Sequence, residues 1–301
     1  MTMTRLIRSE LRKLTTTRMP WAFLAVLAVL AGINAFAVIA GTDFDGSKAF
    51  ISTEADQQSL MAFAANALSI AGLFGAIAVA REYGHHTVVP TFLAEPRRRR
   101  AVLAQLTAIA VSGGVLGLVG AGLTVVSVAV SLPTTDFGFL VSTANVLHVL
   151  VASAFAGAVG AVLGAGIGAL VRNVGGAVTG TVLALFIAPP LIGQLAPDSA
   201  SWMPSVLATV ITGVGEEVSE GAAIFALVVW AAVPAALGVA AVQRRDVARV
   251  PAYAEDVPCK PCATRARNPC RPPLGTARRG AGSTPVNLTQ LADRSLAGRG
   301  S

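Results

Sequence analysis

The densest group of charged and hydrogen-bonding side chains lies between residues 81 and 100. It opens with Arg81, Glu82 and Tyr83 and closes on four consecutive arginines. Guanidinium groups bind carboxylates and lipid phosphates in a fixed geometry. The segment therefore predicts an electrostatic contact with a soluble partner or with lipid headgroups. Its composition also allows a simpler interpretation, a turn whose arginines only orient the chain in a membrane.

A second candidate is the N-terminal segment 5–17. Its apolar residues recur at helical spacing while its basic residues lie on other faces. That pattern is typical of an amphipathic helix lying on a membrane surface. The alternative is a basic flank that only orients the first membrane helix. The residues of the candidate interface helix are Arg5, Ile7, Arg8, Leu11, Arg12 and Leu14.

The rest of the chain carries little chemistry. It contains no G-x-x-x-x-G-K-[ST] phosphate loop, the usual means of binding ATP. His148 has no acid or nucleophile partner in its sequence neighbourhood, and we expect it to form a hydrogen bond near a membrane surface. Cys259, Cys262 and Cys270 lack a fourth ligand. We therefore expect no catalytic residue, no metal site and no cofactor bound by this chain.

The elements that position these groups are expected to be membrane helices. Of the 301 residues, 54% are hydrophobic and only 13% are charged, which excludes a soluble and a disordered chain. Runs of roughly 20 apolar residues cross a bilayer as helices, and these runs lack the alternation of a β-barrel. Six runs occur, at 21–40, 60–80, 103–132, 146–171, 177–195 and 221–242. They predict an all-α integral membrane protein with six transmembrane helices.

Three features inside these runs lead to specific expectations. Gly160, Gly164 and Gly168 repeat at four-residue spacing and predict a close-packed helix contact, within the bundle or across a dimer. Pro189-Pro190 is expected to break the fifth helix, so that the segment from there to Pro204 re-enters the membrane. Arg172 is expected to snorkel towards the membrane surface without a further role.

The distribution of lysine and arginine predicts the orientation. Basic residues dominate the N-terminal segment, the second and fourth loops and the C-terminal segment, whereas acidic residues dominate the other loops. Cytoplasmic segments of membrane proteins carry the excess of basic residues, so both termini are expected in the cytoplasm. The whole net charge of +7 lies in residues 243–301. The charge is therefore no sign of a nucleic-acid partner.

The string EYGHHTVVPTFLAEPRRRRAVLAQ resembles the cytoplasmic loop of ABC-2-type transporter permeases. The opening string RLIRSELRKLTTTRMPW resembles the short interface helix that precedes the first span in that family. The resemblance covers about residues 4 to 248. The matching loop positions are Glu82, Tyr83, Thr87, Thr91, Phe92, Leu93, Pro96, Arg97, Arg98, Arg99 and Arg100.

The resemblance implies the permease subunit of an ATP-binding-cassette exporter in a bacterial plasma membrane. Two permease subunits, as a homodimer or a heterodimer, would form the path through the membrane lipid. Separate subunits would bind ATP and contact the interface helix and the loop 82–100. The apolar helices fit a hydrophobic or amphipathic substrate, such as a drug, a lipid or a peptide. The rival interpretations are a non-transporting membrane anchor or assembly protein and an intramembrane lipid-modifying enzyme.

Three parts follow from this interpretation. Residues 1–19 are expected to form the cytoplasmic interface helix, and residues 20–242 the six-helix permease domain. Residues 243–301 are rich in proline and arginine without apolar periodicity, and they predict a disordered cytoplasmic tail.

Overall fold

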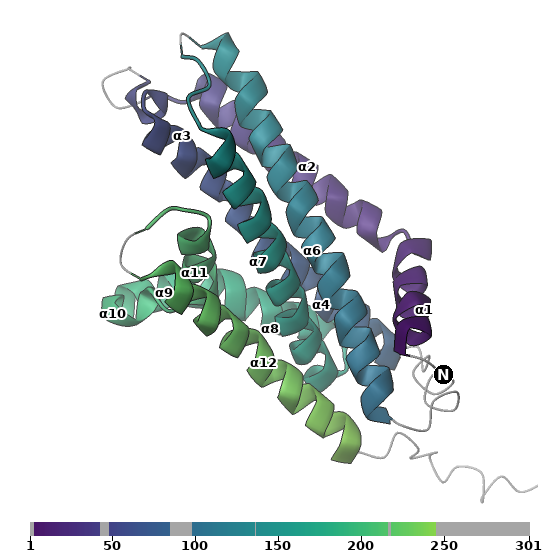
Figure 1. Cartoon of the computed structure of the whole chain (residues 1–301). Helices are drawn as coiled ribbons and strands as arrows, with labels where there is room; N and C mark the ends of the chain where they lie inside the picture. The colour runs from purple at the N-terminus through teal and green to yellow at the C-terminus, as the bar shows by residue number, and fades with distance from the viewer. Residues whose placement is uncertain (1–2, 43–47, 85–97, 136, 216–217, 245–301) are drawn as a thin grey trace, which may run out of the picture. The chain divides into compact units, whose positions relative to one another are not determined.

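A computed structural model describes residues 3–42, 48–84, 98–135, 137–215 and 218–244, which form helices and no strand (Figure 1). The chain divides into two units, Met1–Arg249 and Val250–Ser301, and the second unit lies wholly outside the described residues. The predicted tail, 243–301, therefore lies almost entirely outside them as well. The α-helices are α1 (Met3–Thr16), α2 (Met19–Ala40), α3 (Glu54–Met61), α4 (Ala67–Gly84), α6 (Arg98–Ser131), α7 (Thr143–Val171), α8 (Val174–Val182), α9 (Ala188–Leu195), α10 (Pro197–Ala200), α11 (Pro204–Ile211) and α12 (Glu220–Arg244).

Six helical segments are long and apolar enough to cross a membrane, so the fold is that of an all-α, multi-pass membrane protein. Their positions agree with the predicted runs to within a few residues, except that the second begins earlier, at Glu54, with α3. A short 3-10 turn, Ala62–Asn66, joins α3 to α4. The six segments are Met19–Ala40, Glu54–Tyr83, Arg100–Thr134, Thr143–Val171, Val174–Leu195 and Glu220–Ala241.

Polar side chains fix several helix starts at the ends of these segments. The Thr53 hydroxyl accepts from the Asp56 amide, and the Asp56 carboxylate accepts from the Thr53 amide, which forms a capping box for α3. Ser142 caps α7 by accepting from the Asn145 amide at 3.2 Å. Asn173 caps α8 in the same way through the Gly175 amide. Each cap satisfies an amide that the helix itself leaves without a partner.

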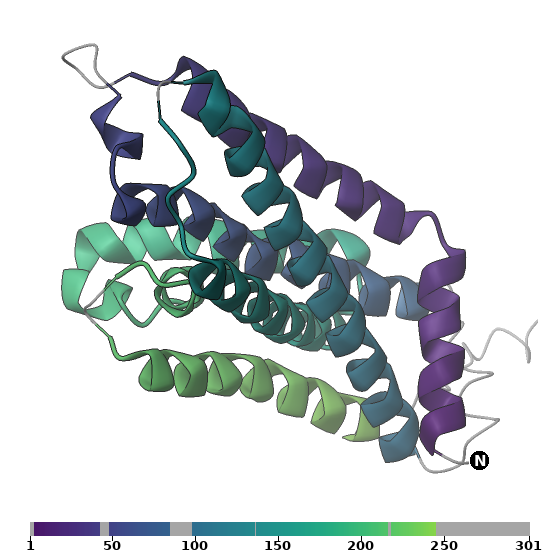
Figure 2. The same cartoon turned by 45° about the horizontal axis from the view of Figure 1, so that its top comes forward.

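Helix α7 is the centre of the bundle. It contacts α4, α6 and α12 along much of its length. Helix α6 runs beside it in Figure 1, and Figure 2 shows α7 nearly along its axis in the middle of the bundle. Its buried residues cover most of its circumference, whereas Leu147 and Val151 leave one face exposed near its start. By contrast, α2 exposes a large apolar surface that includes Trp21, Val29 and Phe36.

The repeated glycines of α7 face α4, so this close-packed contact lies within one chain. A Cβ added at Gly160 or Gly164 would overlap the backbone carbonyl of Leu68 or Gly72, and one at Gly168 would lie 2.6 Å from the Ala76 carbonyl oxygen. The two helix backbones therefore touch, which only glycine permits at these positions.

Two further contacts of the same kind hold α7 to its other neighbours. Gly157 of α7 meets Gly113 of α6, where a Cβ on either residue would overlap the other backbone. Gly166 meets α12, because a Cβ there would lie 2.5 Å from the carbonyl carbon of Pro234. Close backbone contacts thus join α7 to three neighbouring helices, and van der Waals packing is a principal force between helices in a membrane.

The prediction that Pro189 and Pro190 break the fifth helix is wrong. A π-helical turn, η4 (Leu183–Ile187), directly precedes them, and the Ala188 amide bonds to the Leu183 carbonyl five residues back. The prolines then occupy the first turn of α9, where a missing amide hydrogen costs no helical bond. The wider turn therefore lets the fifth span continue to Leu195.

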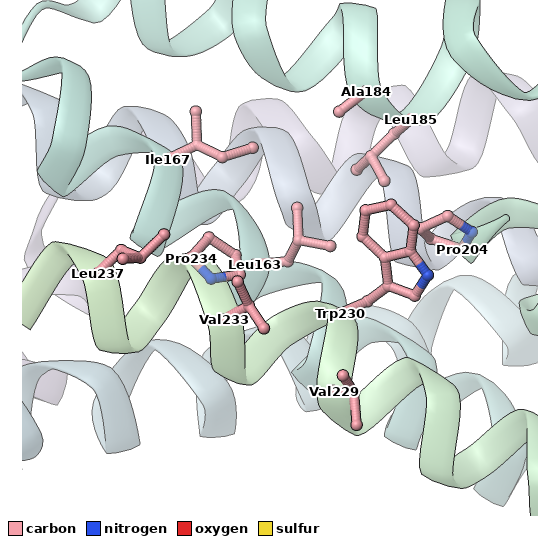
Figure 3. A pocket seen from close by; sticks show the side chains of 10 residues that line it. All are labelled: Leu163, Ile167, Ala184, Leu185, Pro204, Val229, Trp230, Val233, Pro234 and Leu237. Carbon is pink, nitrogen blue, oxygen red and sulfur yellow. The ribbon is translucent and has the colours of Figure 1, made fainter.

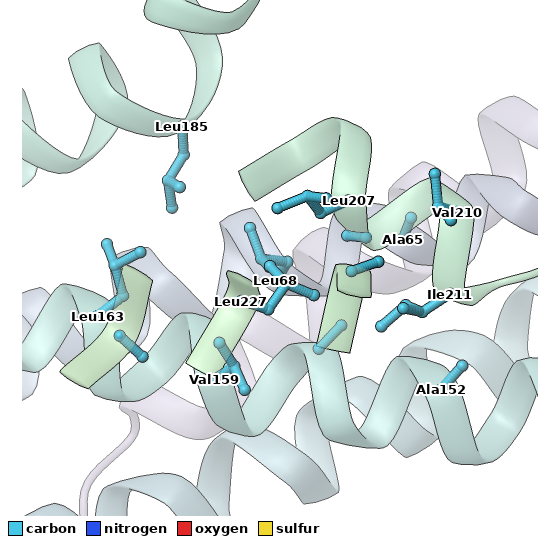
Figure 4. Close-up of a cluster of buried hydrophobic side chains, with 14 of the residues drawn as sticks. Ala65, Leu68, Ala152, Val159, Leu163, Leu185, Leu207, Val210, Ile211 and Leu227 are labelled. Atoms are coloured by element: carbon cyan, nitrogen blue, oxygen red, sulfur yellow. The ribbon is translucent and has the colours of Figure 1, made fainter. Parts of the chain in front are cut away.

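The segment that returns into the bundle is α11, which begins at Pro204, where the expected re-entrant segment ends. Leu207 and Ile211 of α11 are buried against Leu68 of α4 and Leu227 of α12 in the largest apolar cluster (Figure 4). Trp230 of α12 also donates from Nε1 to the Trp202 carbonyl at 3.0 Å. These contacts hold the polar connection between the fifth and sixth spans close to the core.

Candidate functional site

The last turn of α4 contains the first residues of the string that resembles the ABC-2 loop, and it connects several helices. The Glu82 carboxylate accepts a hydrogen bond from the Gln105 amide of α6 at 2.6 Å. It also lies 4.0 Å from the Lys13 ammonium of α1, and its side chain is only 24% exposed. A carboxylate that leaves water needs such partners, so Glu82 links α4 to both α1 and α6.

Lys13 also pairs with a second carboxylate, that of Glu10. Its ammonium lies 2.6 Å from Glu10, whose side chain is 8% exposed. Leu6 and Glu10 are the buried residues of α1, and neither belongs to the apolar face of Ile7, Leu11 and Leu14 that the sequence pattern predicts. One signal was available, since Leu6, Glu10 and Leu14 also follow each other at four-residue spacing.

Tyr83 connects the same turn to the end of α7. The Arg172 guanidinium carbon lies 5.0 Å from the centre of the Tyr83 ring, a cation–π contact. An Arg172 terminal nitrogen donates to the Ala241 carbonyl of α12 at 3.2 Å. Arg172 ends α7 in a left-handed conformation with φ of 57°, which a residue other than glycine rarely adopts. The backbone thus turns so that this side chain bridges α4, α7 and α12.

The expectation that Arg172 merely snorkels is therefore wrong. Its guanidinium lies over an aromatic ring and against a helix end, and its Nε atom is buried with no hydrogen-bond partner among the described residues. An exposed lysine or arginine would instead extend its charged group into water. The contact with the Tyr83 ring offsets part of the free-energy cost of removing the Arg172 guanidinium from water.

Replacing the Tyr83 ring should lower stability more when Arg172 is present than when it is absent. We expect Tyr83→Leu and Arg172→Ala each to reduce the free energy of unfolding, with a coupling of about 1 kcal/mol between them. A double-mutant cycle, measured by denaturant titration of the purified chain in detergent micelles, gives this value. Tyr83→Phe is the matched control, since it keeps the ring and should keep the coupling. Strictly additive effects would show that the contact contributes no stability.

The other predicted interface-helix residues divide by exposure. Arg5, Arg8 and Arg12 are exposed, whereas Ile7, Leu11 and Leu14 are half-buried. Leu14, like Tyr83 and Leu106, packs against a buried cluster that includes Val79 and Ile109. The segment therefore does form a helix, and one of its sides lies against the ends of α4 and α6.

Most of the predicted loop residues cannot be placed. Thr87, Thr91, Phe92, Leu93, Pro96 and Arg97 lie outside the described residues. Arg98, Arg99 and Arg100 form the first turn of α6, but side-chain surroundings are described only for Arg100, which is exposed. Glu82 and Tyr83 are thus the loop-motif residues whose contacts the structure gives.

The other end of the bundle carries a separate polar group. His148 of α7 lies with Nε2 3.0 Å from the Glu220 carboxylate at the start of α12, so this histidine does form a hydrogen bond at a helix end. Glu54 accepts from the Ser142 backbone amide and from the Asn145 side chain. Both contacts join neighbouring spans, and the side chains of His148 and Glu220 are exposed.

One buried side-chain amide forms a hydrogen bond between the first two spans. Asn34, which is 5% exposed, donates from its side chain to the Leu60 carbonyl at 3.3 Å. Within the described part of the chain, no group of three or more His, Cys, Asp and Glu side chains is placed to hold a metal ion.

Together, Glu82 and Tyr83 connect the final turn of α4 to α1, α6, α7 and α12 through charged and aromatic contacts. We refer to Glu10, Lys13, Glu82, Tyr83, Gln105 and Arg172 as the coupling cluster. Comparison with protein-family models and with curated proteins finds no match. The likeness to ABC-2 permeases therefore rests on the sequence motifs alone.

Proposed function

We propose that this chain is the permease subunit of an ATP-binding-cassette exporter of the ABC-2 type, with both termini in the cytoplasm. A separate subunit binds ATP, and a second permease subunit completes the path. The substrate is hydrophobic or amphipathic. The observation that carries the proposal is the coupling cluster, because it ties the first residues of the loop motif to four other helices.

The cluster suits the transmission of a push from a soluble subunit. A force on the loop after Tyr83 acts first on the last turn of α4. Gln105 passes the displacement to α6, Lys13 passes it to α1, and Arg172 passes it to the ends of α7 and α12. Closure of the ATPase subunits would in this way move the helices from an inward-open to an outward-open arrangement.

The glycine contacts between α4 and α7 determine which helices move together. Because the backbones of α4 and α7 touch at Gly160 and Gly164, these two helices cannot slide past each other without a clash. They therefore move as one body, with α1 lying on the membrane surface beside them as the interface helix. The exposed Arg5, Arg8 and Arg12 of α1 are available to lipid phosphates or to carboxylates of the ATPase.

Isolation of the native complex tests the proposal. The tagged chain, extracted from membranes with a mild detergent, should carry a protein with a phosphate-loop motif in stoichiometric amount, identified by mass spectrometry. The complex should hydrolyse ATP. Recovery of the chain without a nucleotide-binding protein, even after chemical cross-linking before extraction, would contradict the proposal and favour a membrane anchor.

A further inference from the structure

An apolar groove lies between α12, α7, α11 and the π-helical turn η4 (Figure 3). Its volume is about 440 Å³. Apolar cavities of roughly 150 Å³ already bind small hydrocarbons, so this one has room for a much larger apolar group. The lining residues are Leu163, Ile167, Ala184, Leu185, Pro204, Val229, Trp230, Val233, Pro234 and Leu237.

The lining accepts hydrocarbon and little else. The Trp230 indole nitrogen is the one polar side-chain atom on it, and that nitrogen already donates to the Trp202 carbonyl. A hydroxyl, amide or charge placed in the groove would find no side-chain partner there. Such a group costs several kcal/mol when it is buried without a hydrogen bond. The part of a ligand that enters must therefore be free of polar atoms.

The groove has a closed floor and an open side. Leu163 and Leu185, 3% and 2% exposed, form the floor. Val229, Val233 and Leu237 on the open side are 43%, 53% and 55% exposed. These three residues recur at four-residue spacing and continue the exposed apolar stripe of α12 that begins at Phe225.

The shape suits an extended chain. The nine residues from Val229 to Leu237 span eight helical steps, which gives the groove a length of about 12 Å along α12. Pro234 lies close to Gly166 of α7, where the two backbones meet. The wider π turn contributes Ala184 to the opposite wall and Leu185 to the floor. The walls thus come from features that a regular helix would lack.

We propose that this groove binds the hydrocarbon chain of a membrane lipid, with the headgroup outside it. The open side lies on a stripe of α12 whose apolar residues would face the bilayer interior, so acyl chains reach the groove without crossing water. Such binding requires no ATPase, and it can be measured on the full chain whether or not the chain exports anything.

Photolabelling tests the site. The full chain is reconstituted in phosphatidylcholine vesicles with palmitic acid that carries a diazirine in its chain, and labelled peptides are mapped by mass spectrometry. We expect labelling of residues 183–187 and 229–237 that saturates and is displaced by unlabelled palmitic acid. Ala184→Phe fills the groove from the wall opposite α12, and Val233→Phe narrows the exposed open side. Each should weaken the saturable labelling by about tenfold, the effect of losing burial for roughly two methylene groups.

Ala37→Phe on the exposed side of α2 is the matched control, and it should leave the labelling unchanged. Val233 is half-exposed, so its replacement leaves the core intact even if Ala184→Phe fails to fold. Three results would overturn the proposal. The first is labelling that never saturates and that equals the labelling of α2. The second is labelling that cholesterol displaces but palmitic acid does not. The third is the absence of labelling together with disulfide cross-links between two copies of a Val233→Cys variant.

Discussion

Gly164→Ala should destabilise the chain by about 3 kcal/mol, at the upper end of the cost of overpacking. The added Cβ would overlap the Gly72 carbonyl oxygen and would lie 2.7 Å from its carbon. Backbone atoms on both sides leave no flexible side chain to yield, so α4 and α7 must move apart. The measurement is the free energy of unfolding of the purified chain, from a denaturant titration in mixed micelles.

Gly122→Ala is the matched control, because it makes the same change in a membrane helix, α6, where a Cβ meets nothing within 4 Å. Alanine favours helix over glycine by up to about 1 kcal/mol, so this variant should be neutral or slightly stabilised. Equal stability of the two variants would show that α4 and α7 do not touch through their backbones.

Glu82→Gln should disconnect nucleotide binding from helix movement. The amide keeps the size of the side chain and an acceptor oxygen for Gln105, but it loses the charge that attracts Lys13 and strengthens the bond from Gln105. In the complex with its ATPase, we expect ATP and vanadate to shift the wild-type chain towards the outward-open state. The ratio of switched to unswitched molecules should fall about tenfold in the variant, through loss of coupling energy.

Spin labels at the exposed residues Leu147 and Phe225 report this change as a distance between α7 and α12. The labels require prior replacement of the tail cysteines Cys259, Cys262 and Cys270 by serine. Arg81→Gln is the matched control, because Arg81 precedes Glu82 but is exposed. A Glu82→Gln complex that switches as fully as the Arg81→Gln complex would remove Glu82 from the coupling path.

The sequence predicted the six spans well, because the length and polarity of an apolar run are imposed by the bilayer itself. It also predicted that Gly160, Gly164 and Gly168 pack closely. It did not predict their partner, because any helix with small residues at four-residue spacing would suit them equally. The partner, α4, was fixed only by the three-dimensional arrangement of the bundle.

The errors in prediction have a common physical origin. The helix continues through Pro189 and Pro190 because a π turn precedes them, so that they lie in a first turn, where a missing amide hydrogen costs no helical bond. No residue pattern predicts such a turn. Glu10 is buried because Lys13 of its own helix pairs with it beside Glu82, a residue distant in sequence. The position of Arg172 over Tyr83 likewise depends on a contact between two helix ends. Hydropathy places helices in a membrane, but it does not pair their polar residues.

Photo-cross-linking from the loop motif tests the central claim most directly. A photoreactive phenylalanine analogue at position 92, in the chain expressed in its native membrane, should cross-link to a protein that carries a phosphate loop. The same analogue at Trp202, in the connection between the fifth and sixth spans, should give no such product. Cross-links from position 92 to lipid alone, or the same products from both positions, would contradict the assignment of this loop to an ATPase contact.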